Sequence, residues 1–294
     1  MEPAQQPRLP VYCGVVMALP IKAPIQPWSK VKIAILRDYA EQYMRIMGKR
    51  RFEKHYVEAF AGSGTHTECT TGDDVLGTPR EILAIQPSFQ HYHFIERDPG
   101  RAAELRKLAP PPSAQIHVYE SDANETLLTT ILPQIEFPKY RRALVFVDPY
   151  TIDLDWRVTA LAGSLKTVDM FINFMIVAAN RNALLQNPDE ITDAQRTRMN
   201  RVWGDDSWFK ALYDDRQLSL FDEISATEKL PKANGLLANA YRQRLTQEAG
   251  FAYAAPPRPF KNRAGAELYY LFFASPNAAG YRVAKHLLEK PVVE

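Results

Sequence analysis

A short glycine-containing segment is the clearest candidate for binding chemistry in this chain. The apolar run Tyr56–Phe60 leads directly into Ala61-Gly62-Ser63-Gly64. Glycines at such a turn let the backbone approach a bound ligand closely and adopt positive φ angles. Glu58 stands near the end of the run, where its carboxylate can receive a ligand's ammonium group. The pattern predicts a ligand-binding turn after a strand, with an ordinary turn and a solvated glutamate as the alternative.

Three further apolar runs also end in polar signatures. His91–Ile95 is followed by Glu96-Arg97-Asp98, Ile116–Tyr119 by Ser121-Asp122-Ala123-Asn124, and Ala143–Val147 by Asp148-Pro149-Tyr150. Ligands of open α/β sheets bind outside the carboxyl ends of the strands. Four consecutive strand ends with acidic or glycine signatures therefore predict a single binding site at one edge of the sheet.

Glu96 and Asp122 have the positions expected of ligands for a nucleoside. A carboxylate at the end of the second strand can accept hydrogen bonds from both ribose hydroxyls, and we predict this role for Glu96. Asp122 can accept a hydrogen bond from the exocyclic amine of an adenine. Each residue also has a plainer interpretation, because Glu96 can cap a helix start and Asp122 precedes Glu125 as a helix N-cap does.

The combined pattern favours S-adenosylmethionine as the cofactor. Its methionine tail is zwitterionic and would place an ammonium group near Glu58. A dinucleotide would require a G-x-G-x-x-G turn for its pyrophosphate, and the third glycine is absent, which weakens a nicotinamide oxidoreductase as the alternative. The residues predicted to hold the cofactor are Glu58, Phe60, Ala61, Gly62, Ser63, Gly64, Glu96, Arg97, Asp122 and Ala123.

The segment Asp148-Pro149-Tyr150 is predicted to face the methyl acceptor. Methyl transfer is an in-line displacement, so positioning of the nucleophile supplies much of the acceleration. Asp148 can orient or deprotonate an amine or hydroxyl, the Pro149 carbonyl can accept a second hydrogen bond, and Tyr150 can stack on a planar acceptor. An Asp-Pro pair is also common in an ordinary turn after a strand.

These motifs together resemble the three-Cys-motif partner proteins, a bacterial and phage-associated family related to class I methyltransferases. The likeness spans most of residues 28 to 288. Its segments are Trp28-Ser29-Lys30-Val31-Lys32, Glu58-Ala59-Phe60-Ala61-Gly62-Ser63-Gly64, Gly77-Thr78-Pro79, Phe94-Ile95-Glu96-Arg97-Asp98, Asp122-Ala123-Asn124, Val147-Asp148-Pro149-Tyr150 and Tyr269-Tyr270-Leu271-Phe272-Phe273-Ala274-Ser275. The resemblance implies S-adenosylmethionine as methyl donor and a partner protein whose three-cysteine motif holds an iron-sulfur cluster. Asp148-Pro149-Tyr150 also resembles the Asp-Pro-Pro-Tyr motif of enzymes that methylate nucleobase amines, but it lacks the second proline.

The elements that must position these residues follow a βαβ pattern. Short apolar runs separated by helical stretches predict a mostly parallel sheet flanked by helices, a Rossmann-like α/β fold of the class I methyltransferase type. The predicted strands are 56–60, 91–95, 116–119, 143–147, 170–174, 251–254 and 268–274. The first predicted helix follows the N-cap Ser29, carries its apolar stripe from Val31 to Ile46 and stops at Gly48; the others are 81–85, 101–108, 125–132, 238–249 and 281–288.

Composition shifts suggest three parts along the chain. Residues 1–27 contain six prolines and predict an extended arm. Residues 28–177 and 232–294 follow the pattern of the Rossmann-like core. Residues 178–231 are polar and helical, which predicts an insertion or lid over that core.

The bulk composition predicts a soluble, cytoplasmic protein. Its net charge is only +2, so no whole-protein field indicates nucleic acid or a membrane. The two cysteines, Cys13 and Cys69, form no C-x-x-C pair, which argues against a zinc site or a disulfide framework and fits a reducing compartment. His91 and His93 alternate along one strand, where packing is more common than ligation, so we predict no metal.

Nucleic acid is a candidate partner through three local basic clusters. They are Lys49-Arg50-Arg51, Arg196 with Arg198 and Arg201, and Arg258 with Lys261 and Arg263. Trp203 and Trp208 could then stack on bases. The sequence therefore predicts a methyltransferase acting on a nitrogen or oxygen nucleophile. Its competitor is a non-catalytic module of the same fold that docks a three-cysteine-motif protein or nucleic acid.

Overall fold

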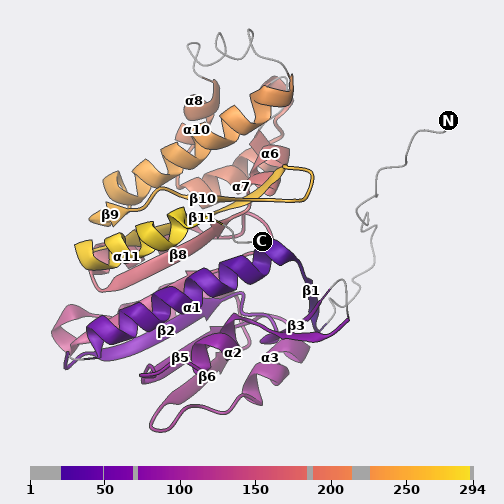
Figure 1. The fold of residues 1–294 in the computed structure, drawn as a ribbon. Helices are drawn as coiled ribbons and strands as arrows, with labels where there is room; N and C mark the ends of the chain where they lie inside the picture. Colours follow the sequence, from indigo (N-terminus) through magenta and orange to yellow (C-terminus); the bar gives the residue numbers. More distant parts are fainter. Residues whose placement is uncertain (1–20, 49, 69–71, 184–187, 214–225, 292–294) are drawn as a thin grey trace.

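A single large sheet forms the centre of the molecule (Figure 1). The computed structural model describes residues 21–48, 50–68, 72–183, 188–213 and 226–291. The strands of the large sheet are β2 (Glu53–Ala59), β5 (His91–Ile95), β6 (Gln115–Tyr119), β7 (Arg141–Val147), β8 (Val168–Phe174), β9 (Tyr253–Ala254), β10 (Arg258–Lys261) and β11 (Glu267–Ser275).

The strand order confirms the predicted Rossmann-like α/β fold. Along the sheet the order is β10-β11-β8-β7-β2-β5-β6, and β2, β5, β6, β7 and β8 are parallel. When these five strands are numbered 1 to 5 along the chain, their order across the sheet is 3-2-1-4-5, as in doubly wound folds. The antiparallel strand β11 lies between β8 and β10. The order reverses between β2 and β7, which is where such folds bind ligands.

Helices cover both faces of the sheet, and each face has its own apolar core. Side chains alternate between faces along a strand, so Tyr56 points to one face and Val57 to the other. The Tyr56 face packs against α1 (Pro27–Met47), α2 (Thr78–Leu83), α3 (Pro99–Arg106) and α11 (Ala278–Glu289). The Val57 face packs against α4 (Ala123–Thr126), the π-helical turn Leu127–Ile131, α5 (Trp156–Leu165) and α10 (Ala226–Gln247).

The structure corrects several predicted element boundaries. Helix α1 begins at Pro27 after the N-cap Gln26, so the prediction of Ser29 as N-cap was wrong. Proline is well suited to the first helical turn because its missing N–H would have no partner there. Strand β2 ends at Ala59, and Phe60 lies beyond it with a φ of 63°.

A second, three-stranded sheet was not expected from the sequence. It consists of β1 (Ala23–Ile25), β3 (Thr65–Glu68) and β4 (Asp74–Leu76), in the order β1-β3-β4. The polar stretch 66–79 therefore contains strand residues as well as the start of α2. Residues 1–20 of the predicted arm lie outside the described residues. The end of the arm is held in place, because β1 pairs in parallel with β3.

The predicted insertion joins the Val57-face core. It contains most of α6 (Ile176–Ala183), the 3-10 turn Pro188–Glu190, α7 (Asp193–Trp203), α8 (Ser207–Tyr213) and the start of α10. Trp203 and Trp208 are 1% and 0% exposed, so the prediction that they stack on nucleic acid bases was wrong. Helix α10 begins before position 231, so no element ends at that predicted boundary. None of the helices in the described ranges combines the length and apolarity that a membrane span requires.

A buried carboxyl between α1 and the sheet makes stability depend on pH. Asp169 accepts hydrogen bonds from the hydroxyls of Tyr39 and Ser275, each at 2.6 Å. Burial outweighs these bonds and raises the pKa of Asp169 from 3.8 to about 6. The folded state therefore binds more protons than the unfolded state between these values. This stabilising contribution is complete below pH 3.8 and is lost as the pH rises through about 6.

We expect the unfolding free energy of wild type, relative to Asp169→Asn, to fall by about 1–2 kcal/mol between pH 5 and pH 8. The asparagine does not titrate, so the difference between the two proteins isolates this carboxyl. Urea unfolding of both proteins at several pH values measures it. A difference that stays constant, or rises with pH, would contradict the assignment.

Candidate active site

The carboxyl ends of four parallel strands meet at one edge of the sheet. Backbone hydrogen bonds continue past the strands there, from Asp148 N to Ala59 O at 3.2 Å, from Ala61 N to Ile95 O at 3.0 Å and from Glu96 N to Tyr119 O at 3.0 Å. The four predicted segments are thereby brought together. Two adjacent cavities, of about 520 Å³ and 300 Å³, open at this edge and share Phe60 and Tyr150 in their walls.

The predicted residues divide between these two cavities. Those in the wall of the larger cavity are Phe60, Glu96, Arg97, Asp122, Ala123 and Tyr150. Those in the wall of the smaller cavity are Glu58, Phe60, Ala61, Gly62, Asp148, Pro149 and Tyr150. Ser63 and Gly64 line neither cavity. The Ser63 hydroxyl donates to Thr65 O at 2.8 Å, so this side chain stabilises the turn and does not face either cavity.

Glu96 is held in a fixed orientation at the larger cavity. Gly62 N donates to its Oε2 and Asp98 N to its Oε1, both at 2.9 Å. The residue is only 7% exposed. A carboxylate has about four acceptor positions, so each oxygen can still accept one further hydrogen bond. Two vicinal hydroxyls, as on a ribose, match this arrangement.

The turn after β2 has the backbone geometry predicted for it. Gly62 and Gly64 have φ angles of 66° and 74°, and an added Cβ at Gly62 would meet no atom within 4 Å. A ligand therefore has room to approach this backbone. At Gly77, a Cβ would lie only 2.9 Å from the carbonyl carbon of Gly64, so two loops pack closely here. Phe60 has a φ of 63°, which is rare for a bulky residue and recurs at functional sites.

Asp122 caps a helix and also lies in the wall of the larger cavity. Its side chain accepts from Glu125 N at 3.0 Å and caps α4, while the residue also lines the larger cavity. The neighbouring Asn124 is 5% exposed and also lines this cavity. Its side chain donates to Asp153 O at 2.9 Å and accepts from Asp155 N at 2.7 Å. The part of the cavity wall around Asp122 is therefore also pre-formed.

Glu58 is buried at the smaller cavity. Its Oε2 accepts from the Tyr56 hydroxyl at 2.8 Å. Burial raises the pKa of its carboxyl well above the ordinary value, and the Asp148 charge adds to the rise, whereas Tyr56 and the Lys32 ammonium oppose it. A ligand's ammonium group beside Glu58 would act in the same direction as Lys32 and favour the charged carboxylate.

Asp148 is held by two residues that the sequence did not single out as functional. Lys32 Nζ lies 2.6 Å from Asp148 Oδ2, and Asn173 Nδ2 donates to Oδ1 at 2.6 Å. The Lys32 side chain is 8% exposed and that of Asp148 26%. Asp148 is therefore a fixed, ion-paired acceptor that can still receive a hydrogen bond from a ligand. This arrangement favours orientation over proton abstraction.

Tyr150 presents its ring at the boundary of the two cavities. Arg101 NH1 donates to its hydroxyl at 2.9 Å, and the guanidinium lies 5.5 Å from the ring centroid. Arg101 is 2% exposed, whereas Tyr150 is 54% exposed. The hydroxyl end is thus anchored in the protein while the rest of the ring remains accessible to a flat ligand.

The basic residues proposed to track nucleic acid do not share one surface. Arg201 lines the larger cavity. Arg258 points to the end of α11, where its NH1 donates to the carbonyls of Leu287 and Leu288. Arg50 and Arg51 precede β2 and so lie at the opposite edge of the sheet, while Lys49 is outside the described residues. Of the cluster members that the structure describes, Arg201 alone lines one of the two cavities.

Comparisons with known proteins give only distant structural likenesses. No protein-family model and no curated protein matches the chain. A protein from Legionella pneumophila, LPL1258, shares 10% identity over 90% of this chain and 92% of its own, with a TM-score of 0.48. Trm1 from Pyrococcus horikoshii, solved with S-adenosyl-L-methionine, shares 10% identity over 88% of this chain, with a TM-score of 0.40. The chain spans 58% of that Trm1 chain. At these scores the functional argument rests on the chain's own residues.

Proposed function

We propose that the protein is an S-adenosylmethionine-dependent methyltransferase that acts on a nitrogen or oxygen nucleophile. The observation that carries this proposal is the pair of cavities that meet at Phe60 and Tyr150. The larger one has two carboxylates, Glu96 and Asp122, that can accept hydrogen bonds from a nucleoside. The other has Glu58 and the Asp148 segment. This is the layout required to bring a donor and an acceptor together at the switch point of the sheet.

The larger cavity is the proposed adenosine site. The fixed Glu96 carboxylate would accept both ribose hydroxyls, and Asp122 would accept the adenine amine. The methionine part would pass Gly62, where the backbone is open, towards Glu58. Pairing of a ligand ammonium with the Glu58 carboxylate would favour its charged form and so offset the burial that raises its pKa.

The smaller cavity would hold the methionine part beside Glu58 and the methyl acceptor beside Asp148. Lys32 and Asn173 fix the Asp148 carboxylate, which would accept a hydrogen bond from the N–H or O–H of the nucleophile and align its lone pair with the methyl group. The donor supplies the activated methyl group as a sulfonium. Trp28, Phe60 and Tyr269 surround the cavity together with Tyr150. These aromatic walls suit a planar acceptor, and a nucleobase is therefore the acceptor class that we propose first.

The three-cysteine-motif protein remains a proposed partner that rests on the sequence resemblance. Under the competing docking function, the fold would bind a partner without using the donor cavity. Donor binding therefore separates the two functions.

Transfer of tritium from methyl-labelled S-adenosylmethionine tests the proposal. Wild type would be incubated separately with mixed RNA, single-stranded DNA and a peptide mixture, and the labelled product digested to identify the methylated atom. We expect label on a nitrogen or oxygen atom, with nucleic acid labelled in preference to peptide. Label on peptide alone would refute the nucleobase acceptor but keep the methyltransferase. Folded protein that neither binds the donor nor transfers label would refute the methyltransferase.

A further inference from the structure

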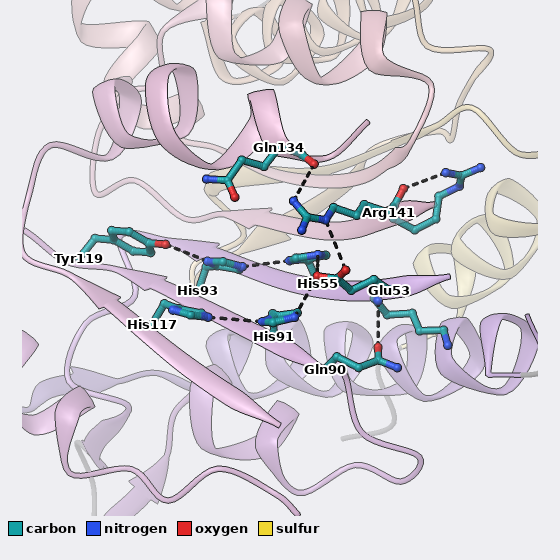
Figure 2. Close-up of polar contacts among 11 residues, drawn as sticks. Glu53, His55, Gln90, His91, His93, His117, Tyr119, Gln134 and Arg141 are labelled. Carbon is teal, nitrogen blue, oxygen red and sulfur yellow. Dashed lines mark hydrogen bonds and ion pairs between the residues drawn. The ribbon is translucent and has the colours of Figure 1, made fainter. Parts of the chain in front are cut away.

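Four of the six histidines gather on the sheet face that carries Val57 (Figure 2). They are His55 on β2, His91 and His93 on β5, and His117 on β6. The parallel register places His55 beside His91 and His93 beside His117. Their ring centroids are 4.7 Å and 4.8 Å apart, respectively. The proposed methyltransferase function uses none of these side chains.

Glu53 joins two of these histidines at the amino ends of β2 and β5. Its Oε1 lies 3.1 Å from His55 Nε2 and 2.9 Å from His91 Nε2. One atom from each of the three residues lies within 4.8 Å of the other two. Bonds of about 2.0–2.1 Å to a tetrahedral zinc ion place its ligand atoms about 3.3 Å apart. Small side-chain rotations would therefore bring all three atoms to bonding distance.

The buried histidine of this cluster has an unsatisfied nitrogen aimed into it. His55 is 4% exposed, and its Nε2 has no hydrogen-bond partner despite the proximity of Glu53. Its other nitrogen, Nδ1, already contacts His93 Nε2 at 3.0 Å. A buried polar atom without a partner is uncommon in native proteins. A cation between Nε2 and the Glu53 carboxylate would satisfy both groups.

Neighbouring side chains contact the histidines of this cluster through the ring nitrogens that face away from Glu53. Metal-binding histidines in proteins usually have such a contact. His91 Nδ1 lies 3.4 Å from His117 Nε2, and His93 Nδ1 lies 3.1 Å from the Tyr119 hydroxyl. Such contacts to the second ring nitrogen fix ring orientation and tautomer. The Arg141 guanidinium contacts Glu53 Oε2 at 3.4 Å and leaves Oε1 for the histidines. Its positive charge also lowers the affinity for a cation, so we expect moderate binding.

We propose that Glu53, His55 and His91 bind one divalent transition-metal ion of the zinc type. Two imidazoles and one carboxylate form a three-ligand set that leaves a position for water. The Glu53 and His91 side chains are 33% and 23% exposed, so an ion can enter from solvent. The site lies at the opposite strand ends from the two cavities, about 20 Å along β2. The ion would therefore link β2 to β5 and stabilise the fold independently of methyl transfer.

Titration of the tag-free, chelator-treated full chain with Zn²⁺ tests this site. We expect one ion per chain with a Kd of about 1–10 µM, and a rise in Tm of about 5 °C when the ion is in about 100-fold excess over Kd. Co²⁺ should give the visible absorption of a nitrogen- and oxygen-bound ion. Glu53→Gln and His91→Ala should each weaken Zn²⁺ binding about 10- to 100-fold.

His286→Ala removes an exposed histidine far from the cluster and should bind Zn²⁺ as wild type does. His91 and Glu53 are partly exposed, so their variants should fold even if His55→Ala does not. The proposal is overturned if folded wild type binds no Zn²⁺ or Co²⁺ up to about 1 mM, a range in which ligation by two histidines and a carboxylate would be detected. It is equally overturned if Glu53→Gln and His91→Ala retain wild-type affinity.

Discussion

Replacement of Asp148 by asparagine is expected to lower kcat for methyl transfer by about 100-fold or more. The Asp148 carboxylate lies between two donors, Lys32 Nζ and Asn173 Nδ2. An asparagine amide has only one acceptor oxygen, so its NH₂ group would face one of these donors. The side chain would rotate away from the position that orients the nucleophile. S-adenosylhomocysteine should still bind within about threefold of wild type, because Asp148 does not line the larger cavity proposed for the adenosine.

Two quantities are measured for wild type and Asp148→Asn. One is kcat with the acceptor that takes the tritium label, and the other is the Kd for S-adenosylhomocysteine. Loss of the ion pair should also cost about 2 kcal/mol of stability, so thermal unfolding sets the assay temperature. Asp206→Asn is the matched control, because Asp206 is exposed and lines neither cavity. Equal losses of turnover and donor affinity would show that Asp148 supports the fold or binds the donor.

Replacement of Glu96 by alanine should abolish measurable donor binding. Its carboxylate would supply two charge-assisted hydrogen bonds to the ribose, each worth about 1.5–3 kcal/mol. Their removal predicts a Kd for S-adenosylhomocysteine that rises about 100-fold or more. The Gly62 and Asp98 N–H groups would lose their acceptor as well, so the turn would also lose its fixed orientation.

Isothermal titration of wild type and Glu96→Ala measures this loss. The control is Glu120→Gln, which removes one negative charge from an exposed ion pair with Arg106, outside the cavity wall. It should leave the affinity unchanged within about twofold, since an exposed pair contributes little. If the alanine variant binds as tightly as wild type, the donor does not use this carboxylate.

The sequence predicted the edge of the sheet at which the site lies because parallel topology alone brings strand ends together. Four apolar runs and the residues after them were sufficient for that inference, and Glu96, Asp122 and Asp148 all line the cavities. Ser63 and Gly64 do not, because a turn exposes only part of its backbone to a ligand. Which part it exposes depends on φ angles that a glycine pattern does not specify.

Contacts between distant segments could not be predicted in the same way. Lys32 is separated from Asp148 by 116 positions and reaches it because α1 packs on the Tyr56 face of the sheet. A lysine within the apolar stripe of a helix was the one available signal. The histidine cluster was missed for a related reason: its members show no metal spacing along the chain and become neighbours only through the register of β2, β5 and β6.

Weak sequence signals account for the remaining differences. Strands β1, β3 and β4 are three or four residues long, and β3 consists of Thr65-His66-Thr67-Glu68, too polar to show an apolar alternation. Trp203 and Trp208 stand among charged residues, and this setting indicated accessible side chains. In the structure their indole N–H groups bond to Ser207 and Asn200 while the rings are buried.

A crystal structure of the protein grown with saturating S-adenosylhomocysteine would show whether this edge of the sheet holds the methyl donor. We expect the ribose hydroxyls on the Glu96 carboxylate, the adenine beside Asp122 and Ala123, and the sulfur directed towards Asp148 and Tyr150. Ligand bound elsewhere, or both cavities without ligand in crystals of folded protein at saturating concentration, would contradict the assignment of a methyl-donor site to this edge.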